Sequence, residues 1–205
     1  KLFFESEYLA ADIALLDPEV TLTLPPKLTA ATGMDALTHA VEALLSANSG
    51  PLTDALALHA VQSIFQWLPV AVREGENVEA RSQMLFASTA AGAAFSSAGV
   101  GVVHACSHGL GVLCGLHHGL ANSIMLPHGV RFNLTGPHPT VPKDMPDRLT
   151  KLAQDCGLPT TLREVEVLEE RLPAVAEYAE GDASMIYNPV PADAGDLLKV
   201  LQNAY

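Results

Sequence analysis

The sequence predicts a mostly α fold, a multi-helix bundle preceded by a short extended N-terminal leader. Aromatic residues make up only 5% of the 205 residues, and Ala and Leu are abundant, which favours helices over a β-sandwich. Hydrophobic residues reach 49% against 17% charged residues, so the chain can bury a sizeable core. From residue 29 onward, apolar residues recur at helical spacing between breaks that contain Gly or Pro.

Residues 1–28 form the predicted leader, and residues 29–205 form the predicted helical domain. Within the leader, residues 2–4 and 13–16 indicate one or two short strands, and Asp17-Pro18 and Pro25-Pro26 are turn signals. Thr29 is the predicted N-cap of a first helix over 30–45. Further helices are predicted over 52–68, 78–97, 102–111, 118–132, 147–156, 168–178 and 193–204.

Charge and cysteine content exclude several classes of protein. The formal net charge of -12 argues against a nucleic-acid partner, which needs a basic face. The three cysteines form no Cys-x-x-Cys pair, so we expect a reducing cytoplasm and neither a disulfide framework nor a thiolate zinc site. No membrane-spanning stretch or signal peptide is expected. Because the chain opens at Lys1 in what reads as mid-chain sequence, we expect an upstream part.

Histidines are concentrated in residues 103–128, which hold five of the eight in the chain. His104 and His108 are four residues apart, so on a helix they project from one face. Asp35 and His39 have the same spacing in the stretch GMDALTHAVEA. Two helical pairs of metal-type side chains predict one site between packed helices.

Asp35, His39, His104 and His118 together would offer a divalent first-row ion one carboxylate and three imidazoles. That set suits Fe(II) or Zn(II) with a coordination position left open. His108 would face the same cavity and relay a proton. A histidine on a helix is more often a packing residue than a ligand, so spacing alone leaves both interpretations open. His117 would point away from the site on a helix start, and we assign structural or surface roles to His59, His128 and His138.

Three stretches closely resemble the C-terminal domain of the iron-containing (group III) alcohol dehydrogenases: LLDPEVTLTLPPKLTAATGMDALTHAVEALLS, AGAAFSSAGVGVVHACSHGLGVLCGLHHGLANSIMLPHGVRFN and the ending IYNPVPADAGDLLKVLQNAY. The resemblance covers essentially the whole chain and implies a dehydroquinate synthase-like C-terminal fold. It also implies that the four candidate ligands match the family's metal positions. His108 matches the histidine beside the nicotinamide and substrate, and Phe95 matches an aromatic that lines the active cleft.

The resemblance implies an NAD(P)-dependent enzyme that interconverts an alcohol with an aldehyde or ketone, with the metal as Lewis acid. Such enzymes hold the dinucleotide mainly in an N-terminal α/β domain, yet no G-x-G-x-x-G occurs in this chain. The leader resembles the segment that joins the two domains, so we expect the isolated chain to be inactive. His117 stands where many relatives have Pro, which leaves His117 and His118 as competing ligands; the spacing and the following GLAN favour His118.

Three other functions compete with this one. The chain would be a non-catalytic helical metal-binding fragment if it acts without a nucleotide domain. A metal-dependent hydrolase ranks last, because no H-E-x-x-H motif supplies a carboxylate base. A glycerol-type dehydrogenase would use zinc and fewer protein ligands, whereas the full ligand set favours iron. We also expect a homo-oligomer, because a missing domain would leave apolar surface uncovered.

Overall fold

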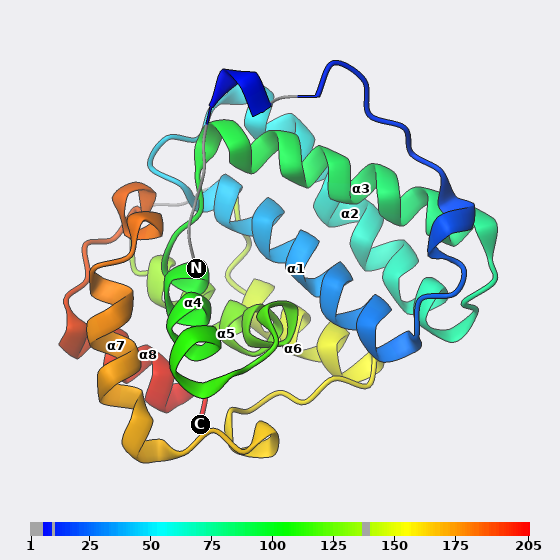
Figure 1. Cartoon of the computed structure of the whole chain (residues 1–205). Coiled ribbons are helices and arrows are strands. Elements are labelled where there is room, and N and C mark those ends of the chain that lie inside the picture. Colours follow the sequence, from blue (N-terminus) through cyan, green and yellow to red (C-terminus); the bar gives the residue numbers. More distant parts are fainter. Residues whose placement is uncertain (1–5, 10, 137–139) are drawn as a thin grey trace.

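The computed structural model describes residues 6–9, 11–136 and 140–205, and these fold into eight α-helices (Figure 1). Their bounds are α1 Pro26–Leu45, α2 Pro51–Arg73, α3 Val78–Ala98, α4 Val102–Cys114, α5 His118–Asn133, α6 Met145–Asp155, α7 Leu172–Glu180 and α8 Ala194–Asn203. Short 3-10 helices cover Glu7–Leu9, Pro18–Thr21, Arg163–Val165, Glu169–Arg171 and Ala183–Tyr187. The predicted mostly α class is confirmed.

The helices pack as two groups that meet where α1 contacts α5. Helices α1, α2 and α3 pack on one another, and α5 lies against α1 (Figure 1). On its other side α5 contacts α4 and α6, while α4 contacts α7 and α7 contacts α8. Glycines allow the close contacts, since a Cβ on Gly33 of α1 would lie 2.3 Å from Leu68 of α2. The junction of α1, α4 and α5 is therefore the centre of the fold.

The leader differs from its prediction. No strand occurs in its described part, and residues 13–16 run without regular structure, whereas residues 2–4 lie outside the described residues. The chain instead forms 3-10 turns, one of which begins at Pro18 and is capped by Asp17. A strand needs a neighbouring strand to pair with its backbone N–H and C=O groups, and no strand occurs among the described residues to pair with 13–16.

The start of α1 also differs from its prediction. The helix begins at Pro26, because proline suits the first helical position, where no N–H donor is needed. Thr29 therefore lies inside the helix and is buried, and it is not the N-cap. Its Oγ1 accepts a hydrogen bond from Arg81 Nη1 at 2.8 Å, and Arg81 also donates to the Leu24 carbonyl at 3.1 Å. Arg81 of α3 thus hydrogen-bonds both the leader, at Leu24, and the first turn of α1, at Thr29.

Helix α2 is longer and more apolar than predicted. It continues past Pro69 to Arg73, because Leu68 and Ala71 are fully buried on either side of the proline. By length and composition alone, with a mean hydropathy of 1.4 over an 18-residue window, it could cross a membrane, a test that core helices also pass. Ala57 and Ile64 are fully buried as well, as in a core helix of a globular protein.

Candidate metal centre

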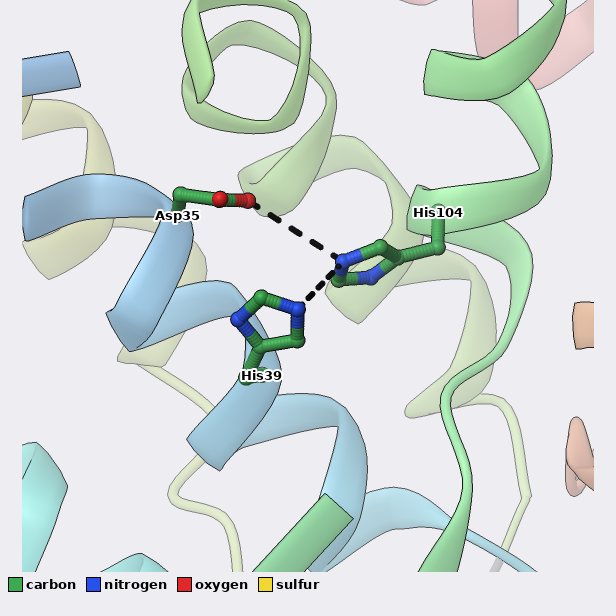
Figure 2. Close-up of side chains that lie close together, drawn as sticks. All are labelled: Asp35, His39 and His104. Carbon is green, nitrogen blue, oxygen red and sulfur yellow. Dashed lines mark hydrogen bonds and ion pairs between the residues drawn. The ribbon is translucent and has the colours of Figure 1, made fainter. Parts of the chain in front are cut away.

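Helices α1, α4 and α5 bring the four predicted ligands to one region. Asp35 and His39 lie one turn apart on α1, and His104 faces them from the first turn of α4 (Figure 2). One donor atom from each of these three residues lies within 4.8 Å of the others. His118 is the first residue of α5, and its Nε2 lies 3.6 Å from Asp35 Oδ1.

The spacing of the donor atoms fits a single divalent ion. Nε2 of His104 lies 3.1 Å from Nε2 of His39 and 4.0 Å from Asp35 Oδ1. Around an ion with ligand bonds of about 2.0–2.2 Å, neighbouring donor atoms lie roughly 3.0–3.6 Å apart. The separations of 3.1 Å (His104 to His39) and 3.6 Å (His118 to Asp35) fall within that range. The 4.0 Å between His104 and Asp35 requires a shift of less than half an ångström.

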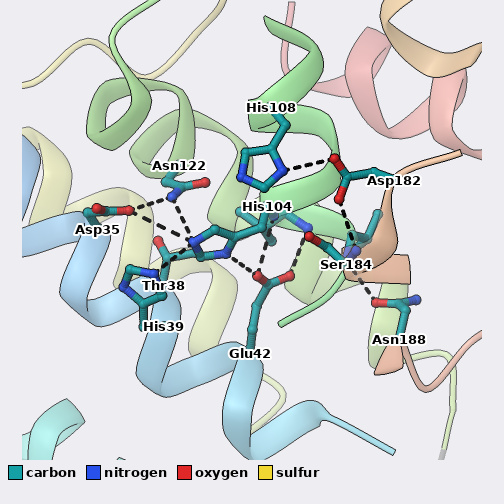
Figure 3. A network of polar contacts seen from close by, with 12 residues as sticks. Asp35, Thr38, His39, Glu42, His104, His108, Asn122, Asp182, Ser184 and Asn188 are labelled. Carbon is teal, nitrogen blue, oxygen red and sulfur yellow. Dashed lines mark hydrogen bonds and ion pairs between the residues drawn. The ribbon is translucent and has the colours of Figure 1, made fainter. Parts of the chain in front are cut away.

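Asn122 gives an independent sign that the site attracts positive charge. Its side chain is fully buried, and Nδ2 donates to Asp35 Oδ1 at 2.5 Å. The same nitrogen lies 3.2 Å from Nε2 of His104 (Figure 3). It also lies 3.2 Å from Nε2 of His118. Asn122 Oδ1, by contrast, is buried without a hydrogen-bond partner among the described residues. The ligand atoms thus surround the positive end of an amide, as they would surround a cation.

The electrostatics of the buried imidazoles also suit metal binding. Burial, and after it the charge interaction with His104, lowers the pKa of His39 to about 4. A neutral imidazole offers its lone pair to a metal, whereas imidazolium does not. Near pH 7 His39 is therefore in the form that an ion requires.

Glu42 is a buried residue of the site that the sequence analysis missed. Its carboxylate is 2% exposed, and Oε2 lies 2.6 Å from Nδ1 of His104. Burial raises the pKa of Glu42 to about 7, against the opposing effect of hydrogen bonds from backbone N–H groups, including those of Val103 and His104. Glu42 lies three residues after His39 on α1, and this spacing could have placed it near the predicted site. The spacing could not identify His104 of α4 as its hydrogen-bond partner.

His108 lies beside the ligands, as its spacing predicted. Its ring stacks on that of His118, with centroids 5.4 Å apart and an interplanar angle of 14°. Nδ1 of His108 lies 2.9 Å from Oδ2 of Asp182, a second residue that the sequence analysis missed (Figure 3). Burial alone would raise the pKa of Asp182, but hydrogen bonds from His108 and Ser184 outweigh it and lower the pKa to about 2. Only an Asp-x-Ser turn marks Asp182 in the sequence.

The remaining candidates take distinct places. Phe95 stacks on His39 with centroids 4.3 Å apart, so an aromatic ring forms one wall beside the ligands. His117 is exposed at the N-cap of α5, and the structure brings His118 to the cluster. His59 is exposed on α2 and His128 is partly buried on α5, whereas His138 lies outside the described residues.

The three cysteines are free thiols. Cys106 of α4 is fully buried, and this burial raises its pKa to about 12. Cys156 is also buried, and its pKa rises to about 11 for the same reason. Because a thiol needs to ionise to act as a nucleophile or ligand, both cysteines act as packing residues near neutral pH.

Comparison with known proteins identifies the family. Residues 29–145 match the C-terminal profile of the Fe-containing alcohol dehydrogenase family. The 1-propanol dehydrogenase PduQ of Salmonella typhimurium is 37% identical over 93% of this chain, and the match spans 58% of that relative. The chain therefore spans little more than half the length of this curated relative.

Solved structures agree with the sequence matches. The iron-containing alcohol dehydrogenase from Thermococcus thioreducens superposes with a TM-score of 0.90 at 29% identity, over 98% of this chain and 56% of that one. A sulfoacetaldehyde reductase from Bifidobacterium kashiwanohense in complex with NAD+ has a TM-score of 0.82 at 32% identity, over 92% and 53%. The chain belongs to the iron-containing alcohol dehydrogenase family, in which it corresponds to the C-terminal helical domain.

Proposed function

We propose that this chain is the metal-binding catalytic domain of an NAD(P)-dependent alcohol dehydrogenase, which interconverts an alcohol with an aldehyde or ketone. The observation that carries the proposal is the approach of Asp35, His39, His104 and His118 to one point from three helices. One carboxylate and three imidazoles suit Fe(II), with Zn(II) as the alternative, and the family supports iron. The relative solved with NAD+ supports a nicotinamide cofactor.

The proposed mechanism assigns the chain's residues to binding and proton transfer. When bound, a divalent ion would supply Lewis acidity to the substrate oxygen, while NAD or NADP would exchange the hydride. Asp182 accepts the Nδ1 proton of His108, which leaves the His108 Nε2 lone pair free to take up a proton beside the site. Phe95, stacked on His39, would line the cleft on the nicotinamide side.

The proposal includes a second domain. Residues 1–28 would connect the helical domain to an N-terminal nucleotide-binding domain, since the match to the 1-propanol dehydrogenase spans 58% of that protein. We further propose a cytoplasmic homo-oligomer in which small alcohols and aldehydes bind between the two domains.

A chimeric enzyme tests the proposal directly. The chain is fused behind the N-terminal half of the Salmonella 1-propanol dehydrogenase, loaded with Fe(II) under anaerobic conditions, and assayed for NADH formation from 1-propanol. We expect turnover that depends on the metal. His104→Ala should lose both the metal and the activity, whereas His108→Ala should keep the metal and lose about 10²- to 10⁴-fold in kcat.

The same experiment tests the non-catalytic alternative. A chimera that is folded, binds Fe(II) and NAD, and still shows no turnover would identify this chain as a metal-binding module without catalysis. The fraction bound to metal is measured by elemental analysis, and folding is measured by circular dichroism. Activity that survives complete removal of the metal would contradict the proposed mechanism.

A further inference from the structure

The first turn of α4 is held by side chains from distant parts of the chain. The first N–H groups of a helix have no partner inside it, and the N-cap Gly101 has no side chain to supply one. Asn188 Oδ1 accepts from Val102 N at 3.0 Å. Glu42 Oε1 accepts from Val103 N at 2.8 Å, and Oε2 accepts from His104 N at 3.3 Å. Glu42 therefore caps α4 from α1.

Glu42 also holds the ring of the ligand that α4 carries. Its Oε2 lies 2.6 Å from Nδ1 of His104, and both side chains are almost fully buried (Figure 3). In its ionised form the Glu42 carboxylate is an acceptor only, which places the ring proton of His104 on Nδ1. The lone pair of His104 Nε2 then faces Asp35 and His39, which are the ligands on α1.

We infer that Glu42 is a positioning residue that sets the metal affinity of the site by fixing the tautomer and orientation of His104. The inference rests on the metal-binding part of the proposed function and identifies a residue beyond the four ligands. Glu42, Asp35 and His39 belong to one helix, so a single rigid element carries two ligands and orients a third. Hydrogen-bonded partners of metal-binding histidines typically contribute 10- to 100-fold in affinity.

The packing around Gly101 supports a fixed position for Glu42. A Cβ at Gly101 would lie 2.5 Å from Asn188 Oδ1 and 3.3 Å from Glu42 Oε1. Asn188 is itself held by a reciprocal pair of hydrogen bonds with Asn133, at 2.9 and 3.0 Å. The side chains of Asn188 and Glu42 therefore lie directly against the backbone at the start of α4, where a larger residue than Gly101 would displace them.

The test compares Glu42→Gln with Asn188→Ala in the 205-residue chain. Both variants lose an acceptor at the start of α4, but the hydrogen bonds of Asn188 go to Val102 N, to the Asn133 side chain and to the Val190 carbonyl. Zn(II) affinity is measured by competition with a chromophoric chelator, and stability is measured by thermal unfolding with chelator present. We expect Glu42→Gln to bind Zn(II) 10- to 100-fold more weakly, and Asn188→Ala to lose stability while its affinity stays within about twofold. Equal affinity losses in the two variants, or none in Glu42→Gln, would overturn the inference.

Nitrogen-15 NMR of the histidine rings keeps the inference testable if Glu42→Gln does not fold. In the wild-type chain, His104 should carry its proton on Nδ1 before Zn(II) is added and keep it afterwards, while the Nε2 resonance shifts. A proton on Nε2 in the metal-free chain would refute the role of Glu42. A correct tautomer in a chain that binds no metal would instead contradict the proposed function and leave the Glu42–His104 bond intact.

Discussion

Gly119→Ala should disrupt the metal centre although no predicted ligand is replaced. Gly119 follows His118 at the start of α5, where this helix crosses α1. An added Cβ would lie 2.5 Å from the carbonyl oxygen of Ala31 and 2.9 Å from its carbonyl carbon. Real Cβ atoms essentially never come closer than 3.0 Å to another atom and ordinary contact begins at 3.4 Å, so the two helices must separate by at least 0.5 Å, and by 0.9 Å for ordinary contact. Because the obstructing atoms belong to the α1 backbone, no side-chain rotation relieves the contact.

The size of this shift decides the outcome. Alanine gains about 1 kcal/mol over glycine in helix propensity, whereas overpacking costs about 1–3 kcal/mol, so the free energy of unfolding should fall by up to about 2 kcal/mol. Metal–ligand distances tolerate only about 0.2 Å. A separation of at least 0.5 Å between α1 and the helix that carries His118 exceeds this tolerance more than twofold. We therefore expect at least a tenfold loss in metal affinity, which corresponds to about 1.4 kcal/mol.

The assay measures Zn(II) and anaerobic Fe(II) affinities by chelator competition, together with thermal unfolding with and without metal. Gly92→Ala is the matched control, because an added Cβ on this α3 glycine meets no described atom within 4 Å. That variant should gain about 0.5–1 kcal/mol in stability and keep the wild-type affinity. A Gly119→Ala chain that binds both ions as tightly as the wild type would refute the reasoning.

Three further predictions follow from the geometry. In the active chimera, Asp182→Asn should lower kcat by about 10²-fold with little change in KM, because the wrong tautomer of His108 becomes available; an unchanged kcat would exclude this role. Burial lowers the pKa of His128 to about 4 from its usual 6.5, so protonation favours the unfolded chain. Stability should therefore fall by up to about 3 kcal/mol as the pH drops from 6.5 to 4, and His128→Gln should flatten this slope in urea titrations. The isolated chain should self-associate, since Leu52 and Phe86 are 83% and 51% exposed, and a strictly monomeric species in concentrated samples would contradict this.

Local sequence patterns were sufficient to predict the helices and the two pairs of metal-type side chains at helical spacing. Most of the predicted helices matched the structure within a few residues, because each apolar stripe is bounded by a glycine or proline break. Gly115, for example, adopts a left-handed conformation at the end of α4. The spacing of Asp35 and His39, and of His104 and His108, placed each pair on one face, since i and i+4 side chains neighbour each other on any helix.

The tertiary structure decided the contacts between these pairs. Glu42 and His104 are 62 residues apart, and His108 and Asp182 are 74 apart, so no local rule links them. Asn122 belongs to a recognisable helix, yet its amide reaches the ligands only because α5 packs against both α1 and α4. The sequence by itself determined the helices and the residue types that could bind a metal, because helical periodicity is local. Which side chains converge, and which carboxylates orient the imidazoles, was decided by helix packing that brings distant residues together.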